Sequence, residues 1–164
     1  MLTFEKDKTY RETVSLTAAI SRSKPMFKRR IKFNSKRKIR PLATATEALA
    51  ERASYGGNPE HKRNPGDFGL TPPAAHCRPD KSLCDGVGIM SRRVALDLLR
   101  TGIRKGLISV QEREGWPQNV WSVTATGEPL EAELENRGQG CYHGYPMPQD
   151  DPFRNEVLKQ WLMA

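Results

Sequence analysis

The most regular hydrophobic pattern in the chain lies between Ser91 and Lys105. Its apolar residues recur at helical spacing and form one stripe, made of Val94, Ala95, Leu98, Leu99 and Ile103. Ser91 is a suitable N-cap, and Gly106 is a suitable stop signal after the last turn. The pattern therefore predicts a long helix over residues 91–105 with one face buried.

A β-hairpin is predicted directly after this helix. Residues 107–110 and 120–124 contain the β-branched and aromatic side chains that are typical of strands. The segment 115–119, Gly-Trp-Pro-Gln-Asn, contains the breakers expected of the turn between them. The two strands should therefore run antiparallel to each other.

Shorter helices are predicted on both sides of this unit. Residues 82–85 indicate a short helix, closed by the small-residue turn at 86–89. After the hairpin, Pro129 stands where the first turn of another helix is expected, which would place Leu130 and Leu134 inward. Residues 81–136 therefore read as helix, turn, helix, hairpin and helix.

The flanking regions have different patterns. Residues 44–53 predict a helix, whereas 55–79 contain so many glycines and prolines that only a long loop is expected. Residues 1–43 show no sustained periodicity and are expected to be mostly disordered.

Near the C-terminus, an apolar stripe at helical spacing consists of Phe153, Val157, Leu158, Trp161 and Leu162. We expect this stripe to be buried on the chain itself or on a partner bound through residues 152–162, with a homodimer as a common solution.

The order of elements in residues 81–136 resembles the winged helix domains of MarR- and PadR-type regulators. The stretches that carry the resemblance are Arg104–Ile108 (RKGLI), Trp121–Thr124 (WSVT), Gly127 and Leu130-Glu131. The resemblance implies that the helix over 91–105 is a recognition helix and that the hairpin is a wing. The expected fold class is α+β. The expected parts are a basic arm (1–43), a short helix with a Gly/Pro-rich loop (44–80), a winged helix-turn-helix domain (81–136) and a loop with a C-terminal helix (137–164).

Positive charge is concentrated at the N-terminus. The chain has a net charge of +8, and residues 1–40 contain 13 Lys and Arg but only 3 Asp and Glu. The remaining residues contain 14 and 16, so the rest of the chain is slightly acidic. Such an arm attracts phosphate backbones without reading bases. The arm residues expected to contact nucleic acid are Lys28, Arg29, Arg30, Lys36, Arg37 and Lys38.

Non-covalent DNA binding is the main functional hypothesis. The helix over 91–105 has four arginines away from its apolar stripe, and arginine suits both phosphates and guanine edges. The interface predicted on this helix and the wing comprises Arg92, Arg93, Arg100, Arg104, Arg113, Gln118 and Asn119. Asp97, Glu112 and Glu114 would oppose phosphates. Because winged helices also dock proteins, an adaptor that binds no nucleic acid is an alternative.

A small metal-independent ribonuclease, of the kind found among bacterial toxins, is another hypothesis. Such cleavage needs one group to take the 2′-hydroxyl proton, another to protonate the leaving oxygen and a cation to stabilise the phosphorane. Two segments distant in sequence carry suitable side chains, namely His61, Lys62, Tyr142 and His143. This hypothesis requires the two segments to meet in the fold.

Signals for metals and cofactors are weak. His76, Cys77 and Cys84 form the best zinc candidate, joined by His61 or His143, but the Cys spacing lacks a second tight pair. No Walker or dinucleotide-binding pattern is present, so no cofactor is expected.

The compartment predicted from the sequence is the cytoplasm of a bacterium. Three cysteines without framework spacing favour a reducing environment. No apolar run approaches the ~20 residues needed to span a bilayer. The N-terminus has no apolar stretch of the kind found in secretory signals, so we expect neither export nor a membrane partner.

Overall fold

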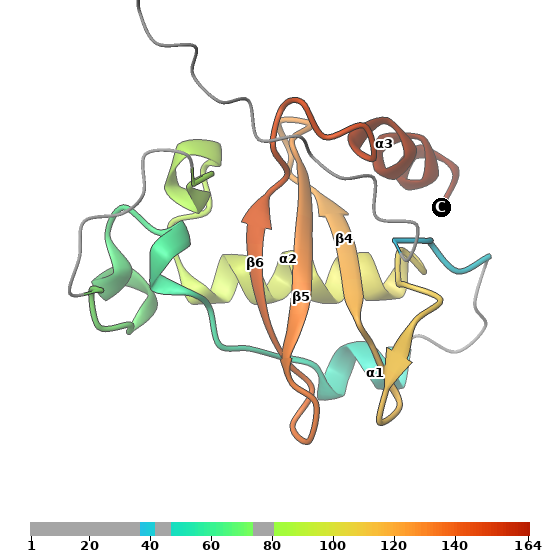
Figure 1. Cartoon of the computed structure of the whole chain (residues 1–164), viewed down its shortest axis with the longest axis horizontal. Helices are drawn as coiled ribbons and strands as arrows, with labels where there is room; N and C mark the ends of the chain where they lie inside the picture. The colour runs from blue at the N-terminus through green and yellow to red at the C-terminus, as the bar shows by residue number, and fades with distance from the viewer. Residues whose placement is uncertain (1–36, 42–46, 74–80) are drawn as a thin grey trace, which may run out of the picture. The chain divides into compact units, whose positions relative to one another are not determined.

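The computed structural model describes residues 37–41, 47–73 and 81–164 (Figure 1). In these ranges it contains three α-helices, a four-stranded mixed sheet and a small separate hairpin, which confirms the α+β class. The helices are α1 (Glu47–Arg52), α2 (Arg92–Arg104) and α3 (Arg154–Met163). Three short 3₁₀ turns are η1 (Pro59–His61), η2 (Pro65–Phe68) and η3 (Cys84–Val87).

The four-stranded sheet has the order β1–β6–β5–β4. Its strands are β1 (Ser54–Tyr55), β4 (Asn119–Val123), β5 (Pro129–Asn136) and β6 (Cys141–Pro146). β5 pairs antiparallel with both β4 and β6, and β1 pairs in parallel with β6. The separate hairpin joins β2 (Glu112–Arg113) to β3 (Trp116–Pro117). The chain therefore brings β1, from the region before the long loop, to the edge formed by its last strand.

The long helix predicted over 91–105 is confirmed as α2. The Ser91 hydroxyl accepts a hydrogen bond from Val94 N at 3.3 Å, and Gly106 follows the helix with a φ of 74°. Leu99 and Ile103 are buried as predicted, but Val94 is 42% exposed, so its predicted inward position is wrong. The buried face is therefore turned toward Gly102 and away from Val94.

Gly102 lets α2 cross β4 at unusually short range. A Cβ at this position would lie 2.2 Å from the backbone oxygen of Trp121, closer than real Cβ contacts. In Figure 1, α2 crosses behind the strands of the sheet. The absence of a side chain at Gly102 therefore fixes how closely the helix packs on the sheet.

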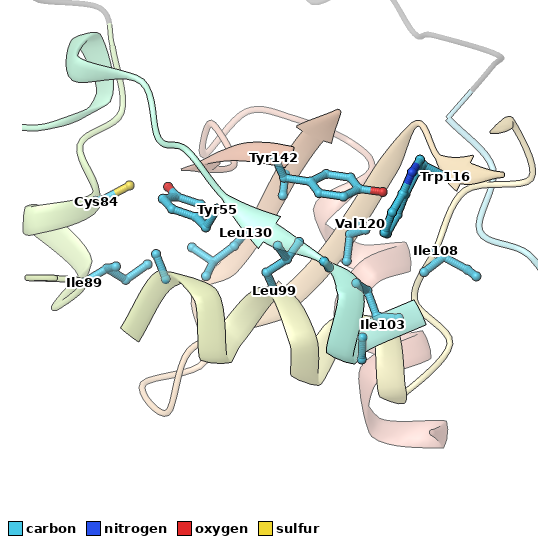
Figure 2. Close-up of a cluster of buried hydrophobic side chains, with 14 of the residues drawn as sticks. Tyr55, Cys84, Ile89, Leu99, Ile103, Ile108, Trp116, Val120, Leu130 and Tyr142 are labelled. Carbon is cyan, nitrogen blue, oxygen red and sulfur yellow. The ribbon is translucent and has the colours of Figure 1, made fainter. Parts of the chain in front are cut away.

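One hydrophobic core fills the space between α2 and the sheet. Leu99 and Ile103 of α2 meet Val120, Leu130 and Tyr142 of the strands (Figure 2). All five side chains are at most 7% exposed. Burial of these apolar side chains, at about 25 cal/mol per Å² of apolar surface, stabilises the packing of α2 on the sheet.

A second, smaller core lies under α3. Val157 is fully buried and packs with Trp121, Met147 and Leu107, with Phe153 partly buried at its edge. The C-terminal apolar stripe is therefore buried on its own chain, as one of the two expected arrangements. Leu162 is an exception, because it is 85% exposed. Whether a homodimer also forms stays a prediction.

The helix predicted from Pro129 is wrong, because residues 129–136 form strand β5. Leu130, Ala132 and Leu134 alternate with acidic residues, which is the period of a strand. Hydrogen bonding to β4 on one side and β6 on the other outweighs the helix propensity of Leu, Ala and Glu. β6 pairs with β5 across the expected domain boundary at 136/137.

Residues 81–136 do not form the predicted helix-turn-helix. The short helix expected at 82–85 is the 3₁₀ turn η3, and the strand 119–123 belongs to the four-stranded sheet. The predicted pairing of the hairpin is confirmed in part, by a bridge between Ile108 and Val120. The turn expected at 115–119 lies instead at Glu114 and Gly115, which have positive φ values of 52° and 79°.

The Gly/Pro-rich loop is ordered over residues 55–73 and packs against the core. As predicted, it contains no α-helix, and η1 and η2 are its two short helical turns. Phe68 and Lys62 are nearly or fully buried, and His61 is 7% exposed. The helix predicted over 44–53 is confirmed as α1 in its described part. None of the helices in the described ranges is long and apolar enough to cross a membrane.

Candidate acid-base site on the sheet

Every second residue of β5 and β6 points away from α2. In the sheet register, Glu131 lies opposite Tyr145, and Glu133 lies opposite His143. We call these four residues, together with His61 and Arg37, the polar face. In Figure 1 this side of β5 and β6 is turned toward the viewer, opposite the side crossed by α2. Strand alternation alone therefore gathers two carboxylates, an imidazole and a phenol on one surface.

Tyr145 connects the two carboxylates of β5. Its hydroxyl donates to Glu133 Oε1 at 2.9 Å and lies 3.2 Å from Glu131 Oε2. Burial raises the pKa of Tyr145, and the two negative charges raise it further. Tyr145 therefore stays protonated near neutral pH and acts as a hydrogen-bond donor at the centre of the polar face.

Glu131 is the most deeply buried carboxylate of the polar face, with 3% of its surface exposed. Arg37 Nη2 donates to its Oε2 at 2.7 Å, and Asn119 Nδ2 donates to its Oε1 at 3.0 Å. Burial raises the pKa of Glu131 to about 7, although the positive charge of Arg37 opposes the shift. A carboxyl group with this pKa can accept or donate a proton near neutral pH.

Arg37 also bridges Glu131 to Asp151. Its Nη1 lies 2.8 Å from Asp151 Oδ2. Burial by itself would lower the pKa of Arg37, but the charges of Glu131 and Asp151 raise it overall. The polar face therefore includes a guanidinium that two carboxylates hold in a fixed position.

His61 reaches the polar face from η1. The side chain of Asn58 caps this turn by accepting from Glu60 N at 2.9 Å. His61 Nδ1 donates to the carbonyl of Ser82 at 3.0 Å, so the lone pair of a neutral ring lies on Nε2. The ring stacks on Tyr145 with centroids 4.8 Å apart. Burial lowers the pKa of His61, which favours the neutral imidazole needed for a base.

His143 approaches Tyr145 from β6. The centroids of the two rings are 6.4 Å apart. Its Nδ1 is buried, has no hydrogen-bond partner among the described residues, and lies 3.9 Å from Glu135 Oε2. Both imidazoles therefore lie beside the same tyrosine, although they are 82 positions apart in the sequence.

The four residues predicted for a ribonuclease divide between the two sides of the sheet. His61 and His143 belong to the polar face, whereas Lys62 and Tyr142 are fully buried in the core. Lys62 Nζ lies 3.0 Å from Cys84 Sγ and donates to the Tyr55 hydroxyl at 3.4 Å. The Tyr142 hydroxyl donates to Pro117 O at 2.8 Å. Tyr142 is separated from His143 because consecutive strand residues point in opposite directions.

Sequence reasoning missed three members of the polar face, Glu131, Glu133 and Tyr145. The signal for the glutamates was present as the alternation Leu-Glu-Ala-Glu-Leu-Glu over 130–135. Arg37 was predicted as a phosphate contact of the arm, but not as a partner of buried carboxylates. Its contact with Glu131 joins residues far apart in the chain, so no local pattern announces it.

Three of the four arginines on α2 contact α1 and β1. Arg92 Nε donates to Tyr55 O at 2.7 Å, and Arg100 donates to the backbone of Glu51 at 3.1 Å. Arg104 Nε lies 2.9 Å from the Glu47 carboxylate. This differs from the groove-facing orientation predicted for them, because α1 lies alongside α2. Arg93 is exposed.

The other predicted nucleic-acid contacts are scattered. Arg113 is exposed on the hairpin, Gln118 is half-buried, and Asn119 binds Glu131. Lys38 is exposed beside Arg37. Four predicted arm residues lie outside the described residues, namely Lys28, Arg29, Arg30 and Lys36.

Of the three main zinc candidates, His76, Cys77 and Cys84, only Cys84 lies within the described residues. This thiol is buried next to Lys62, and burial raises its pKa even though the nearby amine opposes the shift. His76 and Cys77 lie outside the described residues. Within the described ranges, no group of three or more His, Cys, Asp and Glu side chains is placed to hold a metal ion.

The polar face thus combines the parts needed to move protons beside a negatively charged group. His61 offers a proton acceptor, Glu131 titrates near neutral pH, and Arg37 supplies a cation. These parts come from four separate stretches of the chain, held by β5, β6, η1 and residues 37–41. No protein-family model, curated protein or solved structure matches the chain.

Proposed function

We propose that this protein is a ribonuclease that cleaves RNA by acid-base catalysis on the polar face. The observation that carries the proposal is the approach of His61 and His143 to the ring of Tyr145, at 4.8 and 6.4 Å between centroids. Arg37 and Glu131 lie on the same surface. Two imidazoles beside a fixed guanidinium are a suitable set for phosphoryl transfer.

In the proposed reaction, the 2′-hydroxyl of the substrate is the nucleophile. His61 Nε2 takes its proton, because Nδ1 is engaged with Ser82 and the lowered pKa keeps the ring neutral. The 2′-oxygen forms a bond to phosphorus while the bond from phosphorus to the 5′-oxygen breaks. His143 gives a proton to that leaving oxygen, and Arg37 stabilises the charge on the phosphorane. The products are a 2′,3′-cyclic phosphate and a 5′-hydroxyl.

The charge distribution of the chain supports a nucleic-acid substrate. The net charge is +8, and all of the positive excess lies in residues 1–40. Arg37, near the end of this basic stretch, contacts the carboxylate at the centre of the polar face. DNA reading by α2, with residues 81–136 acting as a winged helix, has less support because three of its arginines bind α1 and β1. The adaptor hypothesis has no feature in its favour beyond the original resemblance.

The proposal is tested by incubating the full chain with a single-stranded RNA oligonucleotide in the presence of a chelator. We expect cleavage products that end in a 2′,3′-cyclic phosphate, identified by mass spectrometry. His61→Ala and His143→Ala should each lower the rate by about 10²- to 10⁴-fold, with a cooperative thermal unfolding transition showing that each variant is folded at the assay temperature. An oligonucleotide with 2′-O-methyl groups should remain intact.

Two outcomes would contradict the proposal. One is intact RNA after incubation with a folded wild-type chain. The other is undiminished cleavage by both histidine variants, which would point to a contaminating nuclease. Binding of duplex DNA that disappears on Arg93→Glu, without RNA cleavage, would instead favour the DNA-binding hypothesis for α2.

A further inference from the structure

A groove of about 700 Å³ lies between residues 37–41 and α3. Backbone pairing fixes one wall, because Val110 N donates to Lys38 O at 2.9 Å and Arg40 N donates to Ile108 O at 2.7 Å. Phe153 and the first turns of α3 form the other wall. The groove has the size of a site for a small organic ligand.

Arg37 makes this groove continuous with the polar face. It lines the groove, and its guanidinium carbon lies 4.9 Å above the ring of Phe153. The same guanidinium binds Glu131 at 2.7 Å. Its Nε is buried and has no hydrogen-bond partner among the described residues. A ligand in the groove would therefore touch the cation that the proposed reaction uses.

Lys38 is the cation of the groove that is available to an anionic ligand. Arg37, Lys38 and Arg40 line the groove together with one carboxylate, Glu156. Arg37 is paired with Glu131 and Asp151, and Arg40 is paired with Glu112, whereas Lys38 is exposed and has no acidic partner among the described residues. An exposed lysine attracts a phosphate group without regard to base sequence.

The opposite wall offers groups that suit a nucleobase. Phe153 is half-buried, with the Arg37 guanidinium 4.9 Å over its ring and the Trp121 ring centroid 5.2 Å away, so a base would contact the part of the ring that stays exposed. Gln160 and Glu156, joined by a hydrogen bond of 2.9 Å, supply polar atoms within the same lining. A base must leave a duplex to reach such a wall, which favours single-stranded RNA.

We propose that this groove is a nucleotide subsite that holds single-stranded RNA next to the bond to be cleaved. This inference rests on the ribonuclease function proposed above and names its substrate-binding surface. Lys38 contacts a flanking phosphate, the exposed part of the Phe153 ring contacts a base, and Arg37 is shared between the subsite and the polar face.

The test measures binding separately from cleavage. The full chain is titrated into a fluorescein-labelled 2′-O-methyl RNA oligonucleotide, which lacks the free 2′-hydroxyl, and anisotropy gives the dissociation constant at several salt concentrations. Lys38→Glu should weaken binding about tenfold and lower the slope of log K against log salt by about 0.7, the loss of one phosphate contact. Lys159→Glu, on α3 but outside the groove lining, is the matched control and should leave both values unchanged.

A second variant is expected to increase binding, which a folding defect does not produce. Glu156→Lys adds a cation to the groove and should tighten binding several-fold. Glu51→Lys, an equal charge change on the exposed surface of α1, should leave it unchanged.

Three results would overturn the subsite. These are equal effects of Lys38→Glu and Lys159→Glu, equal effects of Glu156→Lys and Glu51→Lys, or duplex DNA binding as tightly as the single strand. If the groove variants behave as expected but wild-type protein leaves unmodified RNA intact, the ribonuclease proposal fails and the binding site stands. If RNA is cleaved but the groove variants have no effect, the subsite fails alone.

Discussion

The two sides of β5 and β6 differ in what their side chains do. Toward α2, Leu130, Ala132 and Tyr142 are buried in the main core. On the other side, Glu131 and His143 belong to the polar face. Consecutive residues of a strand point to opposite sides of the sheet, so each of these strands contributes side chains both to the main core and to the polar face. The close packing of the buried side chains holds the strands in place, and the charged side chains of the polar face are thereby kept in fixed positions.

The largest effect is expected where α2 crosses the packing side. Gly102→Ala would place a Cβ 2.2 Å from Trp121 O, so the helix must move away from the sheet. We expect the free energy of unfolding to fall by about 3 kcal/mol, as for other overpacked sites. Urea denaturation measures it.

Gly86→Ala is the control for this substitution. No atom lies within 4 Å of a Cβ built at Gly86, and the residue is exposed. The unfolding free energy should change by no more than about 0.5 kcal/mol. Equal effects at Gly86 and Gly102 would show that the close crossing of α2 and β4 has no energetic importance.

A pH-dependent effect is expected on the polar side, at Glu131. Its pKa in the folded protein is about 7, compared with an ordinary value of 4.5. The folded state therefore holds this proton more tightly than the unfolded state. Stability linked to the group is fully present below about pH 4.5 and is lost as the pH rises through about 7, by an amount on the order of 3 kcal/mol.

Glu131→Gln should remove this part of the pH dependence. The difference in unfolding free energy between wild type and variant, measured by urea denaturation from pH 4.5 to 8, should change steadily across the interval. Glu51→Gln is the control, because Glu51 is exposed on α1, far from the polar face in the fold, and the same difference should stay flat. A flat difference for Glu131→Gln would mean that burial does not perturb this carboxyl group.

Tyr142 and Tyr145 point to opposite sides of β6, so the same substitution, Tyr to Phe, can be compared on the two sides. Tyr142→Phe removes the hydrogen bond to Pro117 O and should lower the unfolding free energy by about 1 kcal/mol without changing the cleavage rate. Tyr145→Phe removes the donor shared by Glu131 and Glu133, and should lower the cleavage rate about tenfold. Unfolding curves and rates of RNA cleavage distinguish the two. The opposite pattern would place the chemistry on the packing side.

The smallest effects concern the arginines of α2. Arg100→Ala removes hydrogen bonds to the carbonyls of Glu51 and Ala53 at the end of α1, and should cost about 0.5–1 kcal/mol of unfolding free energy. Arg93→Ala changes an exposed residue and should stay within about 0.5 kcal/mol. Thermal denaturation compares them. Equal stability of the two variants would reopen the groove-facing orientation of Arg100.

Local patterns predicted the parts of the fold that depend on neighbouring residues. α2 was predicted with its cap at Ser91 and its stop at Gly106, because helix signals are read within a few positions. The last helix was predicted from its apolar stripe for the same reason. β5 was not, because its residues favour a helix in isolation and become a strand only between β4 and β6.

For the candidate site, the sequence determined which groups are available, and the tertiary structure decided which of them meet. The alternation over residues 130–135 already separates acidic from apolar side chains, since strand geometry sends neighbours to opposite sides. The stacking of His61 on Tyr145 and the contact of Arg37 with Glu131 join residues 84 and 94 positions apart. Such contacts depend on how η1 and residues 37–41 pack against the sheet, and no short-range pattern encodes that packing.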